Sequence, residues 1–441
     1  MRLISVTLLS CCVSAGAVAQ PCLSTSTWEG FALGGEGTSL YSDVAAPNGV
    51  QLLVGGAFVS PAYLARFTGS GFASVGAGLD GEVRGITRHD DGSGSRLYVT
   101  GFVNVPMSGA WTVCYARLNG GTFESFGPPN GPGSWTGPAV SYNLGLGAKF
   151  LTSGGFAFPC DYVTQWSGTG WECLGGGLGS VVHEAVVYDD GTGAALFCVG
   201  SLIINDLPLS SSIGIGKWTG THWEGVGGIG DGFGQCCTVF DDGSGPELFV
   251  GGSFSRVGTG PSVQAANIAK WNGHRWAALS TGTDRIVRAL APFDDGSGMK
   301  LYAAGDFTRA GATTAARLAR WDGANWSACP AGGLPAGTVN AMIAHDPDGS
   351  GVLPAELVLT GSFASVGGGS VAAGNFAVLH RGENPADFNG DGAVDFFDYD
   401  AFVVCFEGAG CPPSRTADFD GDGAVDFFDY DAFVVAFEAG C

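Results

Sequence analysis

The sequence predicts an all-β fold, a seven-bladed β-propeller, followed by a small all-α module. Three observations support this prediction. A pattern of Leu, an aromatic residue, Val, Gly, Gly, any residue and Phe recurs seven times, about 50 residues apart, as in a repeat fold. The 77 Gly, 20 Pro, 29 Phe and 11 Trp beside 14% charged residues are typical of short strands, tight turns and aromatic packing. The chain ends in an acidic segment with a duplicated twelve-residue pattern.

The first 19 residues have the features of a secretory signal peptide. Arg2 precedes an apolar run at residues 3–9, and the small residues Ala17-Val18-Ala19 fit a cleavage site before Gln20. A weaker alternative is lipoprotein processing at Cys11. We therefore expect a secreted protein that lies outside the cell or at the cell surface and starts at Gln20.

Each repeat contains the patterns of four strands, the content of one propeller blade. An apolar strand that often ends in Asp-Asp-Gly-Ser-Gly precedes the repeated pattern. The segment after the pattern contains an apolar pair, a base, Trp, Gly and a second Trp, and this order predicts two strands joined by a tight turn. We interpret the Asp-Asp-Gly-Ser-Gly segments as capped turns in preference to calcium sites. The seven copies of the pattern are Leu52–Phe58, Leu97–Phe102, Phe150–Phe156, Leu196–Leu202, Leu248–Phe254, Leu301–Phe307 and Leu357–Phe363.

The seventh repeat lacks an outer strand, because its last hairpin stops at Gly382. Residues Trp28–Gly34 have the pattern of the missing strand. We therefore expect residues 20–382 to form seven blades, with the N-terminal strand completing the last blade and removing the open edges. Over roughly residues 24–382 the repeats resemble the kelch-like and related Gly-Gly-x-Phe propellers of secreted bacterial proteins. This resemblance implies the architecture and says little about a ligand.

Residues 383–441 form a separate acidic module, with 14 Asp or Glu and one base, Arg415. Two segments, 387–398 and 418–429, carry oxygen-bearing side chains at positions 1, 3, 5, 9 and 12 and Gly at position 6, the spacing of a twelve-residue calcium loop. The carbonyl at position 7 would add a ligand. We predict two bound calcium ions, with the ligands Asp387, Asn389, Asp391, Ala393, Asp395 and Asp398, and Asp418, Asp420, Asp422, Ala424, Asp426 and Asp429.

Position 12 of each loop is Asp rather than the Glu of an EF-hand sensor, and no helix of useful length precedes either loop. The tail from Asp387 to Cys441 instead resembles the dockerin module, a duplicated calcium loop and helix, in the variety that ends in Gly-Cys. The resemblance implies anchoring to a cohesin-like or cell-surface partner. Known dockerins usually carry small polar residues at loop positions 10 and 11; here the candidate partner-binding residues are Phe396, Phe397, Phe427 and Phe428.

Residues 390–404 recur without change at 421–435, so the module should have near two-fold symmetry. Helical spacing predicts an apolar face on each helix that forms the core between them. Its members are Phe397, Ala401, Phe402 and Phe406, and Phe428, Ala432, Phe433 and Phe437. The mature chain has eleven cysteines, an odd number for a disulfide-permissive compartment, and Cys405 with Cys411 is the local pair that we expect to be bridged.

The net charge of −22 disfavours nucleic acid, and no later segment has the 18 or so apolar residues of a membrane span. We could locate neither a Ser, His and acid set nor converging carboxylates, so enzymatic activity is uncertain. Our primary interpretation is a non-catalytic binding or scaffold protein whose propeller presents a surface to a glycan or a protein. The alternatives are a secreted polysaccharide-active enzyme, a hydrolase or lyase on a propeller scaffold, and a structural envelope component.

Overall fold

The structure is a computed structural model of the 441-residue chain. It describes residues 26–60, 62–105, 114–127, 132, 136–157, 159–205, 207, 213–258, 262–349, 353–381, 386–389, 394–412, 416–419 and 423–438. These residues fall into two compact units, the larger one ending at residue 381 and the smaller one beginning at residue 386. We describe each unit by itself.

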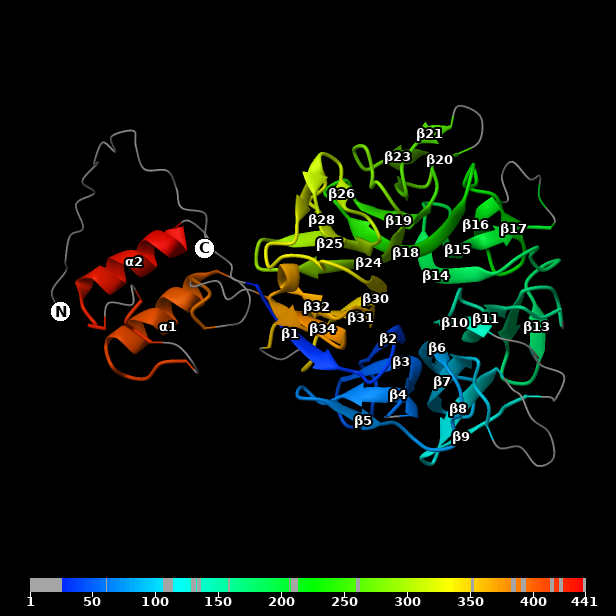
Figure 1. The fold of residues 1–441 in the computed structure, drawn as a ribbon, viewed down its shortest axis with the longest axis horizontal. Helices are drawn as coiled ribbons and strands as arrows, with labels where there is room; N and C mark the ends of the chain where they lie inside the picture. The colour runs from blue at the N-terminus through cyan, green and yellow to red at the C-terminus, as the bar shows by residue number, and fades with distance from the viewer. Residues whose placement is uncertain are drawn as a thin grey trace. The chain divides into compact units, whose positions relative to one another are not determined.

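The larger unit contains seven four-stranded antiparallel sheets, which confirms the predicted seven-bladed β-propeller (Figure 1). The strands of each blade are given from the inner to the outer one. Blades 1 to 3 are, in turn, β2 (Gly37–Asp43), β3 (Gln51–Val59), β4 (Ala62–Phe67) and β5 (Phe72–Ser74); β6 (Val83–Asp90), β7 (Ser95–Gly101), β8 (Tyr115–Asn119) and β9 (Thr122–Glu124); and β10 (Thr136–Tyr142), β11 (Lys149–Gly154), β12 (Val163–Trp166) and β13 (Trp171–Cys173). Blades 4 to 7 are, in turn, β14 (Val182–Asp189), β15 (Ala194–Ile203), β16 (Ile213–Trp218) and β17 (Trp223–Glu224); β18 (Phe233–Asp241), β19 (Pro246–Ser253), β22 (Ile268–Trp271) and β23 (Trp276–Ala278); β24 (Val287–Asp294), β25 (Met299–Gly305), β28 (Leu318–Trp321) and β29 (Trp326–Ala328); and β30 (Thr338–His345), β31 (Glu356–Ser362), β34 (Asn375–His380) and β1 (Thr27–Ala32). Blades 5, 6 and 7 also carry short hairpins, β20 (Arg256–Val257) with β21 (Val263–Gln264), β26 (Arg309–Ala310) with β27 (Thr313–Thr314), and β32 (Ser365–Val366) with β33 (Val371–Ala372).

The inner strands form a closed ring. Each one contacts the inner strand of the next blade, and β2 of the first blade contacts β30 of the last. Blade 7 is completed by β1, which pairs with β34 from Thr27 opposite His380 to Ala32 opposite Asn375. Because β1 precedes all the other strands in the sequence, this pairing joins the two ends of the propeller unit within one sheet.

The turn between the first and second strands of several blades is held by its first aspartate. In blade 6, Asp294 Oδ1 accepts hydrogen bonds from the backbone N–H of Gly296 (2.9 Å) and Gly298 (3.0 Å). Gly296 has a φ of 97° and Gly298 a φ of 89°, a region that glycine adopts readily. The Asp-Asp-Gly-Ser-Gly segments are therefore capped turns, as the sequence analysis favoured.

The second aspartate of these turns is paired with the base on the third strand of its own blade. The four pairs are Asp91–Arg117, Asp190–Lys217, Asp242–Lys270 and Asp295–Arg320. Each of these carboxylates is almost fully buried, with at most 4% of its side chain exposed. The paired base balances the negative charge of each buried carboxylate. These pairs therefore account for the second aspartate without a bound cation.

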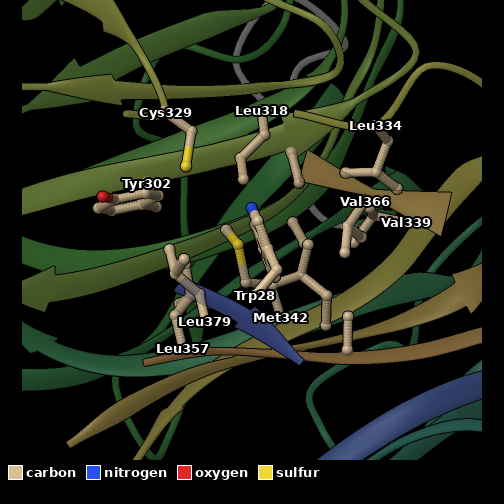
Figure 2. Close-up of a cluster of buried hydrophobic side chains, with 14 of the residues drawn as sticks. Trp28, Tyr302, Leu318, Cys329, Leu334, Val339, Met342, Leu357, Val366 and Leu379 are labelled. Atoms are coloured by element: carbon tan, nitrogen blue, oxygen red, sulfur yellow. The ribbon is translucent and has the colours of Figure 1, made fainter. Parts of the chain in front are cut away.

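Tryptophans of the outer strands connect neighbouring blades. The indole N–H of Trp276 donates to the carbonyl of Val226 (2.7 Å), and that of Trp326 donates to Leu279 (3.0 Å). Trp28 on β1 donates in the same way to Gly332 (2.9 Å). Figure 2 shows Trp28 in the middle of the apolar cluster between blades 6 and 7, so β1 contributes to the core as well as to the sheet.

The smaller unit contains two helices, α1 (Phe396–Phe406) and α2 (Phe427–Glu438). Phe402 of α1 stacks on Phe433 of α2, with ring centroids 4.1 Å apart and an interplanar angle of 6°. Phe388 and Phe419, which occupy the same place in the two loops, pack edge-on against this pair. The Cys405–Cys411 disulfide is present, as predicted. Neither helix in the described part of the chain is long and apolar enough to span a bilayer.

Candidate metal loops and docking face

The structure describes eight of the twelve predicted calcium ligands. Asp391, Ala393, Asp420 and Asp422 lie outside the described residues. The described members occupy loop positions 1, 3, 9 and 12 in the first loop and positions 1, 7, 9 and 12 in the second. These residues show how the two ends of each loop meet.

The aspartate at position 12 ties the start of each loop to its end. Asp398 is fully buried; its Oδ1 accepts from the backbone N–H of Asn389 (3.0 Å) and its Oδ2 accepts from that of Asp395 (2.8 Å). Asp429 is 1% exposed and accepts in the same way from Phe419 (2.6 Å) and Asp426 (2.8 Å). Both loops are thus closed by a buried carboxylate with two backbone donors.

The aspartate at position 9 begins each helix. Asp395 is the N-cap of α1, where its Oδ1 accepts from Phe397 N–H (2.8 Å) and it forms a capping box with Asp398. Asp426 accepts from Phe428 N–H (2.8 Å) at the start of α2. Capping alone is thus a structural reason for acids at positions 9 and 12. A carboxylate oxygen has further lone pairs, so a capped oxygen can still be a metal ligand.

The aspartate at position 1 of the second loop, Asp418, has a carboxylate oxygen that a cation could contact. Asp418 Oδ2 accepts from Gly423 N–H (3.0 Å), whereas its Oδ1 is buried and has no hydrogen-bond donor among the described residues. Such an oxygen costs free energy unless something positive faces it. The donor set of the two loops is entirely oxygen, the chemistry that calcium prefers. Within the described residues no three His, Cys, Asp or Glu side chains gather closely enough to hold an ion, and position 5 of both loops falls outside them.

The four candidate partner-binding phenylalanines are all on the surface of the unit. Phe396 is 72% exposed, Phe397 69%, and Phe427 and Phe428 70% each. Phe396 stacks against Tyr399, and Phe427 stacks against Tyr430, with ring centroids 6.0 Å apart in both cases. The two tyrosine hydroxyls hydrogen-bond to each other. The rings of Phe396, Tyr399, Tyr430 and Phe427 thus form one continuous row, which we call the aromatic row.

The prediction that Phe397 and Phe428 belong to the core between the helices is wrong. The buried stripe of α1 consists of Asp398, Phe402 and Cys405, which are spaced by four and three residues. Phe397 lies one residue away from this stripe and therefore points elsewhere. Asp398 can take the buried place because the backbone donors of the loop satisfy its carboxylate. The predicted core positions Phe402 and Phe433 are fully buried.

The propeller holds polar pairs between blades that the sequence did not indicate. His89 Nδ1 lies 3.0 Å from Ser141 Oγ, and His345 Nδ1 lies 2.9 Å from Ser42 Oγ. Both histidines are buried, which lowers their pKa values. These Ser and His side chains are far apart in sequence, so no local motif could have revealed them. Their burial makes them interfaces between blades rather than sites that a substrate reaches.

Two further acidic groups have shifted pKa values or lie near a cavity. Glu184 is partly exposed, but desolvation by the surrounding protein raises the pKa of its carboxyl to about 7. The backbone N–H of Cys237 donates a hydrogen bond to this carboxyl (2.9 Å), which acts in the opposite direction. Glu356 contacts His380 at the edge of blade 7. A cavity of about 460 Å³ lies there, lined by Thr27, Pro347, Leu353, Pro354, Glu356, His380 and Arg381.

Comparisons with known proteins add no function. No family model and no curated protein matches the chain. Among solved structures, BBS1N in complex with ARL6DN is 7% identical, with 81% of this chain and 97% of that chain covered and a TM-score of 0.46. The Dos1 propeller is 9% identical, with 81% and 95% covered and a TM-score of 0.40. The pairing of the strands itself defines the class of protein, a seven-bladed propeller followed by a small helical segment. Structural similarities this distant add nothing to that assignment.

Proposed function

We propose that the chain is a secreted, non-catalytic binding or scaffold protein. Its propeller presents a ligand-binding surface to a glycan or a protein, and its C-terminal unit, loaded with two calcium ions, attaches it to a cohesin-like or cell-surface partner. The observation that carries the proposal is the position of four exposed phenylalanines at the starts of two helices, at positions 10 and 11 of two loops that a buried aspartate at position 12 closes.

Calcium acts in this proposal by ordering the loops. The residues that would hold it are the oxygen ligands at positions 1, 3, 5, 7, 9 and 12 of each loop. A bound ion supplies the positive charge that offsets repulsion among the carboxylates of one loop, and metal binding then contributes to folding. Asp398 in the first loop and Asp429 in the second connect the two ends of their own loop. An ordered loop therefore also holds the start of the helix that follows. The phenylalanines at the helix starts are positioned by the same contacts.

The aromatic row has the composition of a docking surface. Large apolar side chains that are about 70% exposed are uncommon on a monomer when they cluster, and aromatic residues are frequent at the energetic centres of interfaces. The row is accompanied by the exposed acidic residues Asp400 and Asp431, which are not among the predicted calcium ligands. A complementary partner would therefore present an apolar groove with a basic rim.

A binding measurement on the full chain tests this proposal. Surface plasmon resonance with a panel of purified cohesin domains should find binding in calcium that EDTA abolishes. Because the unit has two equivalent ends, the informative variant is the pair Phe396→Ser with Phe427→Ser, and we expect an affinity loss of about tenfold or more. Leu146→Ser, at a residue of the propeller that is 68% exposed, is the matched control. Calcium uptake without binding to any cohesin would reject this class of partner.

A further inference from the structure

Two of the seven free cysteines in the described part of the propeller are accessible to solvent. Of the free cysteines in the described residues, Cys160 is half-buried and Cys173 is exposed. The others are buried in the blades, namely Cys114, Cys198, Cys236, Cys237 and Cys329. An oxidant in solution therefore meets Cys160 and Cys173 first.

The two accessible thiols lie together at the outer edge of blade 3. Cys173 ends the outer strand β13 and is paired with Thr164 of β12. Cys160 lies in the loop before β12, where its Sγ donates to the carbonyl of Val163 (3.1 Å), the neighbour of Thr164. Cys173 is near enough to Cys160 to help raise the pKa of the Cys160 thiol. Backbone contacts fix this arrangement, since the carbonyl of Tyr162 accepts from Gly154 N–H (3.0 Å).

We propose that Cys160 and Cys173 form a disulfide that fastens the outer strand of blade 3 to the loop before β12. The oxidant is an external disulfide, such as oxidised glutathione or a thiol–disulfide oxidoreductase. The thiolate of Cys173 attacks it, which forms a mixed disulfide and releases one thiol. The thiolate of Cys160 then attacks the Cys173 sulfur, so that the new S–S bond forms, the mixed S–S bond breaks and a second thiol leaves. The protein loses two electrons and two protons, and the external disulfide gains them.

The order of these steps follows from the surroundings of the two thiols. Burial, together with the neighbouring Cys173, raises the pKa of Cys160 to about 12, so Cys160 is protonated at neutral pH. Cys173 is the exposed partner and reacts first. Cys160 is the resolving thiol, and the rate of its attack should increase with pH because the thiolate is the nucleophile.

Peptide mapping of the full chain tests the proposal. The protein is treated with oxidised glutathione until Cys405–Cys411 is closed, then denatured in an alkylating reagent and digested. We expect a peptide pair linked through Cys160 and Cys173 that reductant separates. If both cysteines are alkylated while Cys405–Cys411 is closed, or if either is linked to one of the buried cysteines, the proposal is wrong.

Single substitutions test the assigned roles. In Cys160→Ser the reaction should stop at glutathione bound to Cys173, because the resolving thiol is missing. In Cys173→Ser, Cys160 should take up glutathione at least tenfold more slowly than Cys173 does in Cys160→Ser, because Cys160 is half-buried and its pKa is raised. Cys114→Ser, at a buried cysteine of blade 2, should leave the cross-link unchanged. Faster modification of Cys160 than of Cys173 would contradict the proposed order of attack.

Discussion

Lys217 and Asp190 form a buried ion pair inside blade 4. Their side chains are 5% and 4% exposed, and Lys217 Nζ lies 3.0 Å from Asp190 Oδ2. Thr192 Oγ1 also accepts from Lys217 (2.6 Å). These partners and the charge of Lys217 lower the pKa of Asp190 despite its burial. The pair connects the turn of the blade to its third strand.

We expect Asp190→Asn to lower the free energy of unfolding of the propeller by about 2 kcal/mol, because Lys217 loses its buried counter-charge and keeps Glu224 at 3.1 Å, whose side chain is 43% exposed. Urea unfolding followed by tryptophan fluorescence measures this change. The matched control is Asp306→Asn, which removes the partner of Arg288 in a pair whose side chains are 32% and 30% exposed, and it should cost about 1 kcal/mol or less. Equal effects of the two substitutions would show that burial does not decide the strength of these pairs.

At the scale of the element, His380 joins three strands of blade 7. Its Nδ1 lies 3.0 Å from Glu356 Oε1 on β31, and its Nε2 lies 3.2 Å from Glu29 Oε2 on β1. The hydrogen bond to Glu356, with the nearby charge of Glu29, raises the pKa of His380 above its ordinary value of 6.5. Protonated His380 therefore stabilises the fold fully below pH 6.5, and this stability is lost as the pH rises through the folded-state pKa.

The variant His380→Gln should lose more stability at about pH 6 than at about pH 8, because only the protonated ring is held by both carboxylates. Chemical unfolding of the variant and of the wild-type protein at both pH values gives the comparison. His274→Gln, at an exposed histidine of blade 5, controls for the substitution itself. The same loss at both pH values would mean that His380 acts through packing and not through its charge.

Individual elements differ in how far the sequence could predict them. The capped turns were predictable because Asp294, Gly296 and Gly298 interact within five residues. The core of the C-terminal unit was predicted only in part: spacing identified Phe402, but the buried place of Asp398 depends on backbone donors from Asn389 and Asp395, which the loop brings together only when folded. Contacts such as His380 with Glu29, 351 residues apart, leave no local pattern.

At the scale of the whole molecule, the sequence indicated seven blades because each blade repeats the same residues at the same places. The N-terminal strand β1 also follows the repeat, since Trp28 makes the same kind of contact with the preceding blade as Trp276 and Trp326 do. What binds to the propeller could not be predicted, because the repeated residues serve the turns and the blade interfaces and the loops between them have no common pattern.

Removal of β1 tests how much the ring depends on its closure. We expect a chain without residues 1–32 to lose at least the ~3 kcal/mol typical of a buried Trp, since Trp28 is 8% exposed. The open edge of β34 should also promote association. Thermal unfolding with light scattering measures both effects, and a chain without residues 1–25 is the control. Unchanged stability of the shorter chain would show that β34 tolerates an open edge.

The central claim is that two oxygen-rich loops of the C-terminal unit bind calcium, and isothermal titration calorimetry of the full chain tests it most directly. We predict two ions per chain in metal-free buffer, and loss of one ion in Asp418→Ala, because its buried Oδ1 faces no hydrogen-bond donor among the described residues. Asp431→Ala, at an exposed acid of α2, should still bind two. No heat of binding in the wild-type protein would contradict the claim.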